Sequence, residues 1–280
     1  MAQPAPSASV LDVIDSAGRD GDGPAMVMTV TDIYRFPMKG LSAERLDEAS
    51  LLAGETLNAD RRFAVALGST PVEGAYSEWK PKTSFLALVR NEKLATLETK
   101  FDDASETLTV LRNGRQVSRG KLTDGVGRGM LEEFFKAYMG DEARGRPRIV
   151  EAADGHVLSD VPDKVVSIIS KASVRDLERV TGKPVDPLRF RGNIVVEADE
   201  PWTEFQWIGR NIVIGGATLR VIDRIERCAA TNVDPTTAAR DMNIPLTLQR
   251  GFAHTDMGIY ARVISDGTVT TGDTVTPVDD

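Results

Sequence analysis

Short runs of apolar and β-branched residues recur between residues 27 and 278, and several of them alternate with polar residues. Alternation over about four to eight residues is the period of a strand with one buried face. The sequence therefore predicts strands at 27–36, 62–67, 85–90, 165–169 and 194–198, and two or three short strands within 259–278.

Two pairs of strand-like runs meet at two-residue turns. Asn113-Gly114 lies between the halves of 106–119, and Gly215-Gly216 lies between the halves of 211–223. Asn and Gly tolerate the positive φ angles of the tight turns that join antiparallel strands. Both segments are therefore predicted to be β-hairpins.

Helical periodicity is limited to two segments. Apolar residues recur at i, i+3, i+4 and i+7 from Leu131, which predicts a helix over 128–139. A second short helix is expected at 173–182, where Ser173 and Asp176 resemble a capping box. Because strands dominate and βα units do not alternate regularly, we expect an α+β fold that is predominantly antiparallel β.

Local composition suggests how the chain is divided. The polar segment 140–148 contains Gly and Pro, and is expected to join a domain at 26–145 to one at 146–280. Residues 1–25, rich in Ala, Ser, Gly, Pro and Asp, are expected to form a mobile tail. No stretch approaches the roughly 18 apolar residues of a membrane span, and the first residues lack the features of a secretory signal. A cytoplasmic location is therefore expected.

Charge and cysteine content exclude several classes of function. The 280 residues include 34 Lys and Arg against 42 Asp and Glu, a net charge of −8. This balance weighs against nucleic acid or an anionic membrane as partner, because phosphate binding needs a basic face. The single Cys excludes a disulfide framework, a Cys-rich zinc site and a four-Cys iron–sulfur cluster within the chain. Only two His weigh against a His-based metal cage.

Common catalytic motifs are missing or weak. No Walker-type phosphate loop or nucleophile elbow occurs in the sequence. Gly125, Gly127 and Gly129 form only a partial dinucleotide fingerprint, and a loop is the favoured interpretation. His156 and His254 each lie two residues from an aspartate, which is commonplace on protein surfaces.

Two groups of residues are candidates for chemistry. Cys228 follows a predicted strand and lies near Arg224 and Arg227; adjacent cations favour the thiolate, but a lone Cys is most often an inert buried residue. In the second group, Arg189, Arg191 and Asn193 occupy alternate positions, which would point to one side of a strand.

The strand side formed by Arg189, Arg191 and Asn193 would either bind a planar anion or phosphate, or form a solvated, ion-paired face. Lys39 and the pair Arg61-Arg62 add local positive charge in the N-terminal half.

Six segments together resemble one protein family. They are VTDIYRFPMKGL, DRRFAV, LSDVPDKVVSIISKASVRDLERV, RFRGNIVVE, DRIERCAATNVDPTT and GIYARVISDGTVTTGDTV. The chain resembles MOSC-domain proteins that carry an N-terminal MOSC-associated β-barrel domain, in particular the mitochondrial amidoxime-reducing component and its bacterial relatives. The most specific segment resembles the family signature around its metal-ligating Cys, and the main departure is Gly192, where Pro is usual.

The resemblance implies a MOSC β-barrel with few helices, an N-terminal β-rich domain, and a molybdenum cofactor. It makes 40–52 extended, although the composition there hints at helix. Cys228 matches the molybdenum ligand and the catalytic cysteine. The positions that match the family's cofactor-binding site are Lys39, Arg62, Ser159, Asp160, Arg191, Asn193, Arg227 and, as an aromatic near it, Tyr260.

The implied activity is the reduction of N-hydroxylated compounds, amidoximes and hydroxylamines, from N–OH to N–H. The chain has no spare cysteines and no credible nicotinamide or flavin motif. An external electron-transfer protein is therefore expected as a partner, and no membrane anchor is expected. The alternative is a protein that carries molybdenum cofactor, or sulfur on Cys228, without turnover. A barrel that binds no metal is a third possibility, against which Cys228, Arg191 and Asn193 argue.

Overall fold

The computed structural model describes residues 28–72 and 74–278. The expected tail at 1–25 lies outside these residues. The fold is mostly β, as predicted. The strands are β1 (Met28–Arg35), β2 (Glu44–Leu46), β3 (Glu48–Leu51), β4 (Phe63–Ala66), β5 (Leu97–Asp102), β6 (Thr107–Arg112), β7 (Arg115–Lys121), β8 (Arg148–Glu151), β9 (Val166–Ser170), β10 (Ile194–Glu197), β11 (Asn211–Ile214), β12 (Ala217–Glu226), β13 (Asp256–Ser265), β14 (Gly267–Thr270) and β15 (Thr274–Val278). The helices are α1 (Gly125–Met139), α2 (Lys171–Thr181) and α3 (Ile244–Phe252).

Seven strands close into a barrel in the order β10-β9-β13-β12-β11-β15-β1, and β1 completes the ring by pairing with β10. β1 lies between β10 and β15, because its residue Thr29 pairs with Glu197 on β10 and with Thr274 on β15. Only the β9–β10 pair is parallel within the barrel. Inward-facing aliphatic residues such as Val30, Leu219 and Ala261 fill its interior. Closure leaves no unpaired barrel edge, which removes a common route to aggregation.

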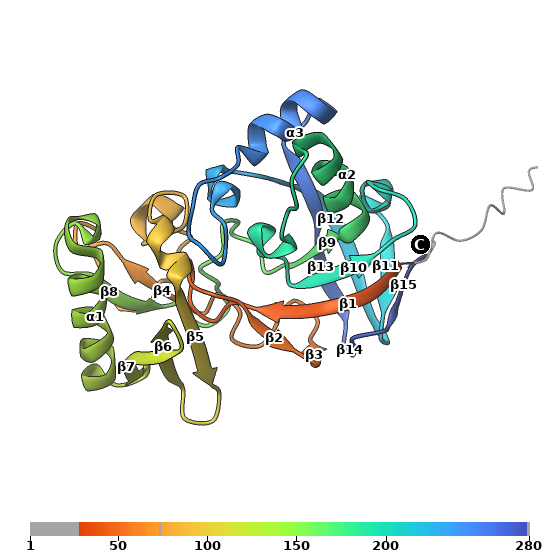
Figure 1. Cartoon of the computed structure of the whole chain (residues 1–280). Coiled ribbons are helices and arrows are strands. Elements are labelled where there is room, and N and C mark those ends of the chain that lie inside the picture. The colour runs from red at the N-terminus through yellow and green to blue at the C-terminus, as the bar shows by residue number, and fades with distance from the viewer. Residues whose placement is uncertain (1–27, 73, 279–280) are drawn as a thin grey trace, which may run out of the picture.

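Two helices cover one side of the barrel (Figure 1). α2 and α3 pack on each other and against the barrel wall through a separate apolar cluster that includes Leu177, Leu248 and Met257. Residues from two distant parts of the chain thus form one layer outside the β-sheet.

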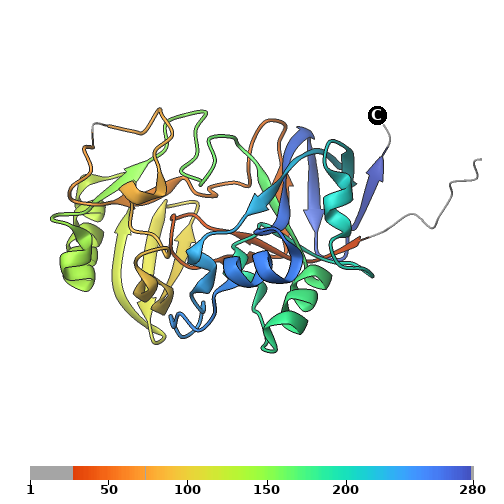
Figure 2. The same cartoon turned by 90° about the horizontal axis from the view of Figure 1, so that it is seen from above.

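The rest of the chain forms smaller sheets beside the barrel (Figures 1 and 2). β5, β6 and β7 make an antiparallel sheet, β4 pairs with β8, and α1 packs over them around a core that includes Phe63, Leu108 and Phe135. Strands from before residue 145 pair with strands from after it, so the two expected domains share sheets. β1 belongs to the barrel, β3 pairs with β14, and β8 returns to β4.

Both predicted hairpins are confirmed. Asn113 and Gly114 have φ angles of 52° and 72° between β6 and β7, and Gly215 and Gly216 turn β11 into β12 with φ angles of 52° and 88°. The segment 40–52 is extended as β2 and β3, as the family resemblance implied.

The strand predicted at 85–90 is wrong. Phe85 forms a single bridge with Ala66, and the chain then turns. The Asn91 side chain accepts a hydrogen bond from Ala87 N at 3.1 Å, while Asn91 N donates to Ala87 O at 2.9 Å. These two bonds satisfy the Ala87 backbone locally and compete with a longer sheet ladder.

The interpretation of the partial glycine fingerprint as a loop is also wrong. Gly125, Gly127 and Gly129 lie in the first turns of α1, and Asp124 caps the helix by accepting from Gly127 N at 2.6 Å. A Cβ on Gly127 would lie 2.3 Å from Lys121 O on β7. The glycine is therefore required for the close crossing of helix and strand.

The start of the second helix differs from the prediction. α2 begins two residues earlier than expected, and Ser170, not Ser173, is its N-cap. The Ser173 hydroxyl instead donates to the buried Glu204 carboxylate at 2.8 and 3.0 Å. Ser173 therefore bonds a buried carboxylate in the folded protein and does not form the predicted capping box.

Within the described residues, no helix combines the length and apolarity needed to cross a membrane.

Candidate functional site

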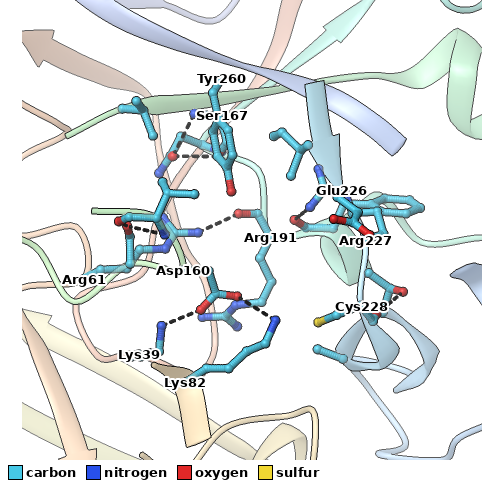
Figure 3. Close-up of a pocket in the computed structure, with 18 of the residues that line it drawn as sticks. Lys39, Arg61, Lys82, Asp160, Ser167, Arg191, Glu226, Arg227, Cys228 and Tyr260 are labelled. Atoms are coloured by element: carbon cyan, nitrogen blue, oxygen red, sulfur yellow. Dashed lines mark hydrogen bonds and ion pairs between the residues drawn. The ribbon is translucent and has the colours of Figure 1, made fainter. Parts of the chain in front are cut away.

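A cavity of about 480 Å³ lies where the barrel meets the N-terminal sheets (Figure 3). All predicted site residues except Arg62 line it. They are Lys39, Ser159, Asp160, Arg191, Asn193, Arg227, Cys228 and Tyr260. Arg61 and Lys82, which were not predicted to bind cofactor, also line the cavity.

Cys228 lies just past the end of β12, where the chain leaves the barrel. The residue is partly exposed, and its thiol faces the cavity (Figure 3). Its carbonyl accepts hydrogen bonds from Thr231 N at 3.1 Å and from Thr231 Oγ1 at 2.9 Å. The short 3₁₀ turn Ala229–Asn232 therefore fixes the backbone directly after the thiol.

Arg227 is held by backbone carbonyls. Its Nε donates to Met257 O at 2.8 Å, and its Nη1 donates to Phe190 O at 2.9 Å. No carboxylate within the described residues forms an ion pair with it, and burial lowers its pKa to about 10. It remains a cation at neutral pH, without an acidic partner.

A second cation without an acidic partner in the described structure is Arg191. Its guanidinium stacks 4.2 Å from the centroid of the buried Phe36 ring, and the Arg61 guanidinium lies 4.7 Å from the same centroid. Arg191 Nη1 donates to Leu41 O at 2.6 Å, and Arg61 donates to Arg191 O at 2.8 Å. Burial, and then the charge of Arg61, lower the pKa of Arg191 to about 9. The Phe36 ring thus makes cation–π contacts with both guanidinium groups.

Two lysines converge on Asp160. Lys39 is buried and its Nζ lies 2.5 Å from Asp160 Oδ1, while Lys82 Nζ lies 3.8 Å from Oδ2. Burial alone would raise the pKa of Asp160, but the two lysines lower it to about 2. For Lys82, burial opposes the charge, but Asp160 and then Cys228 raise its pKa. Lys82 thus lies between a carboxylate and the thiol (Figure 3).

The remaining predicted residues differ in what they offer a ligand. Burial raises the pKa of Tyr260, so its hydroxyl stays a neutral donor at the cavity wall. The Ser159 hydroxyl donates to Val161 O. The Asn193 amide is already used, because its Oδ1 accepts from Ser167 N at 3.1 Å and from Ser167 Oγ at 2.7 Å. Asn193 therefore ties β9 to the segment before β10.

Arg62 does not line the cavity. It pairs with Glu106 at 2.8 Å and Glu151 at 2.7 Å, and lies over the Phe63 ring. The preceding residue, Arg61, has a φ of 53°, and this left-handed turn sends the two neighbouring arginines in different directions. The sequence contains both arginines of DRRF but no signal to choose between them. Lys82 lies in a segment that has no recognisable functional motif.

The expectation that Arg189, Arg191 and Asn193 share one side of a strand is wrong. Pro187–Phe190 is a 3₁₀ turn, η4, and Arg191 has a φ of 52°. Arg189 consequently leaves the turn toward Asp234 and Asp241, away from the Phe36 ring on which Arg191 stacks.

Neither histidine lines the cavity. His156 is exposed, and its Nδ1 lies 3.1 Å from Asp154 O. His254 packs against the rings of Trp202, Phe205 and Phe252.

Comparison with known proteins identifies a domain in the second half of the chain. Residues 154–276, which include Cys228, Arg191 and Arg227, match the family model of the MOSC domain. The chain contains a MOSC domain. It is distantly related to mitochondrial amidoxime reducing component 2 of Bos taurus, with 31% identity over 147 residues, which is 48% of this chain and 43% of the relative. Mitochondrial amidoxime-reducing component 1 of Homo sapiens is 29% identical over 120 residues, 39% of this chain and 35% of the relative. The matched part of this MOSC-domain chain thus spans less than half the length of these relatives.

A further relative is the molybdenum cofactor sulfurase of Caenorhabditis elegans, 31% identical over 119 residues, which is 41% of this chain and 16% of the relative. Among solved structures, the YUAD protein of Bacillus subtilis covers 89% of this chain and 94% of its own, with a TM-score of 0.42 and 13% identity. Nothing about function follows from a similarity at this level.

Residues outside the MOSC domain also line the cavity. Lys39, Arg61 and Lys82 come from the chain before residue 154. The whole lining carries seven Lys or Arg side chains against five Asp or Glu side chains, and Figure 3 shows five of the cations, Lys39, Arg61, Lys82, Arg191 and Arg227. The acidic residues of the lining are Asp60, Asp160, Asp163, Asp223 and Glu226. In a chain of net charge −8, this MOSC cavity is locally cationic. Buried charge without a partner is costly, so the arrangement favours an anionic ligand.

Proposed function

We propose that this MOSC-domain protein is a molybdenum-cofactor-dependent oxidoreductase that reduces N-hydroxylated compounds. The observation that carries the proposal is one thiol, Cys228, in the wall of a cavity whose cations Arg191 and Arg227 have no acidic partner in the described structure. The names of the bovine and human relatives support amidoximes as a substrate class.

The residues present fit such a cofactor. Molybdopterin holds its metal through sulfur and ends in a phosphate. A soft cysteine thiolate suits a sulfur-ligated metal, and the surplus of cations suits the phosphate. Cys228 is the single cysteine of the chain and would supply the protein's sulfur ligand. The volume of about 480 Å³ is ordinary for a cofactor site.

Each group in the cavity has a role in this proposal. Cys228 would ligate the metal, while Lys39, Arg61, Lys82, Arg191 and Arg227 would neutralise the anion. Tyr260, Ser159 and Asp160 would contact the pterin at the wall. The bound cofactor supplies the two-electron redox chemistry. The net reaction converts N–OH to N–H with two electrons and two protons and releases water, and the electrons come from an external electron-transfer protein.

The proposal is tested by elemental analysis of protein purified from a host that makes molybdopterin, paired with reduced-dye oxidation by an amidoxime. We expect near-stoichiometric molybdenum and amidoxime-dependent dye oxidation. Cys228→Ser should fold with an unchanged melting temperature and lose the activity, because a hydroxyl is a poor substitute for a soft thiolate. Full activity in that variant would refute the ligand assignment, and absence of both metal and pterin in the wild type would refute the function.

A carrier of molybdenum cofactor or of Cys228-bound sulfur is the second candidate, favoured by the match to the molybdenum cofactor sulfurase. The same pair of measurements separates the two functions. Molybdenum without dye oxidation on any amidoxime or hydroxylamine would favour the carrier.

A further inference from the structure

Arg189 is a buried arginine whose side chain contacts one segment. Its Nη2 lies 2.9 Å from Asp234 Oδ2 and 2.8 Å from Asp241 Oδ1, and its Nη1 donates to Asn232 O at 3.2 Å and to Thr231 O at 3.5 Å. The side chain is only 2% exposed. Its Nε is buried and has no hydrogen-bond partner within the described residues. The guanidinium is thus oriented by the acceptors of segment 231–241, at the cost of one unsatisfied donor.

This segment begins three residues after Cys228 and is tied to it. The Thr231 carbonyl accepts from Arg189, while Thr231 N and Oγ1 both donate to the Cys228 carbonyl. A short chain of contacts therefore runs from the buried guanidinium to the backbone of the cysteine.

The turn that carries Arg189, η4, also contacts Arg227, the residue before the cysteine. The carbonyl of Phe190, which directly follows Arg189 in η4, accepts from Arg227 Nη1 at 2.9 Å. The turn at 187–190 therefore anchors the chain on both sides of Cys228, through a side chain on one side and a carbonyl on the other.

We propose that Arg189 is a positioning residue that fixes where the Cys228 thiol lies in the cavity. The proposal rests on the proposed role of Cys228 as metal ligand, but its test needs neither metal nor turnover. Cys228 is the single cysteine of the chain, so thiol alkylation reports on this position alone.

The experiment compares Arg189→Gln with a matched control, Arg35→Gln. Arg35 is similarly buried, with 8% of its side chain exposed, and also bonds two carboxylates, Glu44 at 2.9 Å and Asp103 at 2.7 Å. Unlike Arg189, it does not line the cavity. Both variants lose a buried arginine and its ion pairs, so both should be destabilised. The readouts are the melting temperature and the rate of Cys228 alkylation by iodoacetamide in cofactor-free protein.

We expect Arg189→Gln to raise the alkylation rate by about threefold or more, because the released segment opens locally, and Arg35→Gln to leave the rate unchanged. An equal change in both variants, or no change in Arg189→Gln, would overturn the proposal. If Arg189→Gln does not fold, Asp241→Asn and its counterpart Asp103→Asn replace the pair, with the same expected contrast. These results are independent of molybdenum content, so failure here and failure of the proposed function are distinguishable.

Discussion

Arg61 and Arg62 are adjacent in the chain but lie in different electrostatic environments. Arg61 stacks on Phe36 beside Arg191 at the cavity, whereas Arg62 is neutralised by Glu106 and Glu151 on the N-terminal sheets. The left-handed conformation at Arg61 produces this divergence. The pair therefore offers a matched test of which cations serve the cavity.

Arg61→Gln should weaken retention of the cofactor by about tenfold or more, because one charge-assisted contact to the anion is lost. Arg62→Gln should retain cofactor like the wild type. The measurement is pterin and molybdenum content after equal dialysis of the two variants. Equal losses in both would show that the cavity's cations do not hold the anion individually.

At the scale of elements, the glycines of α1 serve packing. β7 crosses the first turn of the helix so closely that a Cβ on Gly120 would lie 2.2 Å from Gly127 O, and a Cβ on Gly127 would lie 2.4 Å from Lys121 N. Gly129, two residues further along the same helix, has no atom within 4 Å of the position its Cβ would take. A side chain is therefore excluded by contact at Gly127 and is sterically allowed at Gly129.

Gly127→Ala should lower the free energy of unfolding by about 2 kcal/mol, because backbone atoms must move to admit the methyl group. Gly129→Ala should raise it by about 0.5 to 1 kcal/mol, since alanine loses less conformational entropy in a helix. Urea denaturation of both variants measures the difference. A stable Gly127→Ala would mean that helix and strand are not held at this separation.

On the scale of the whole molecule, the barrel and the cavity both depend on residues outside the MOSC match. β1 pairs with β10 and β15 to close the barrel, and the chain that follows it brings Lys39, Arg61 and Lys82 to the cavity. Without β1, two strand edges and part of the aliphatic interior would face water.

A fragment of residues 154–280 should therefore lack cooperative thermal unfolding and should bind a hydrophobic dye, whereas the full chain should unfold cooperatively. Adding a peptide of residues 28–51, which carries β1 to β3, should restore the transition. Near-ultraviolet circular dichroism and dye fluorescence follow both effects. A fragment that unfolds as cooperatively as the full chain would show that closure by β1 is dispensable.

The sequence by itself determined the local structure wherever neighbouring residues dominate the energy. The turns at Asn113-Gly114 and Gly215-Gly216, the periodicity of α1 and most strands follow from backbone preference and from alternation of apolar residues. The signature around Cys228 likewise indicated the MOSC domain, which residues 154–276 match, and all but one of the predicted site residues line the cavity.

Only the tertiary structure decided which side chains meet. Arg61 lines the cavity in place of Arg62, and Lys82 reaches the thiol from a distant segment. Arg189, which also lines the cavity, forms ion pairs with Asp234 and Asp241 in the chain after Cys228. Backbone twists at single residues and ion pairs between segments up to about half the chain apart set these positions. Neither has a local sequence pattern, because the energy that selects them comes from burial and charge in the folded protein.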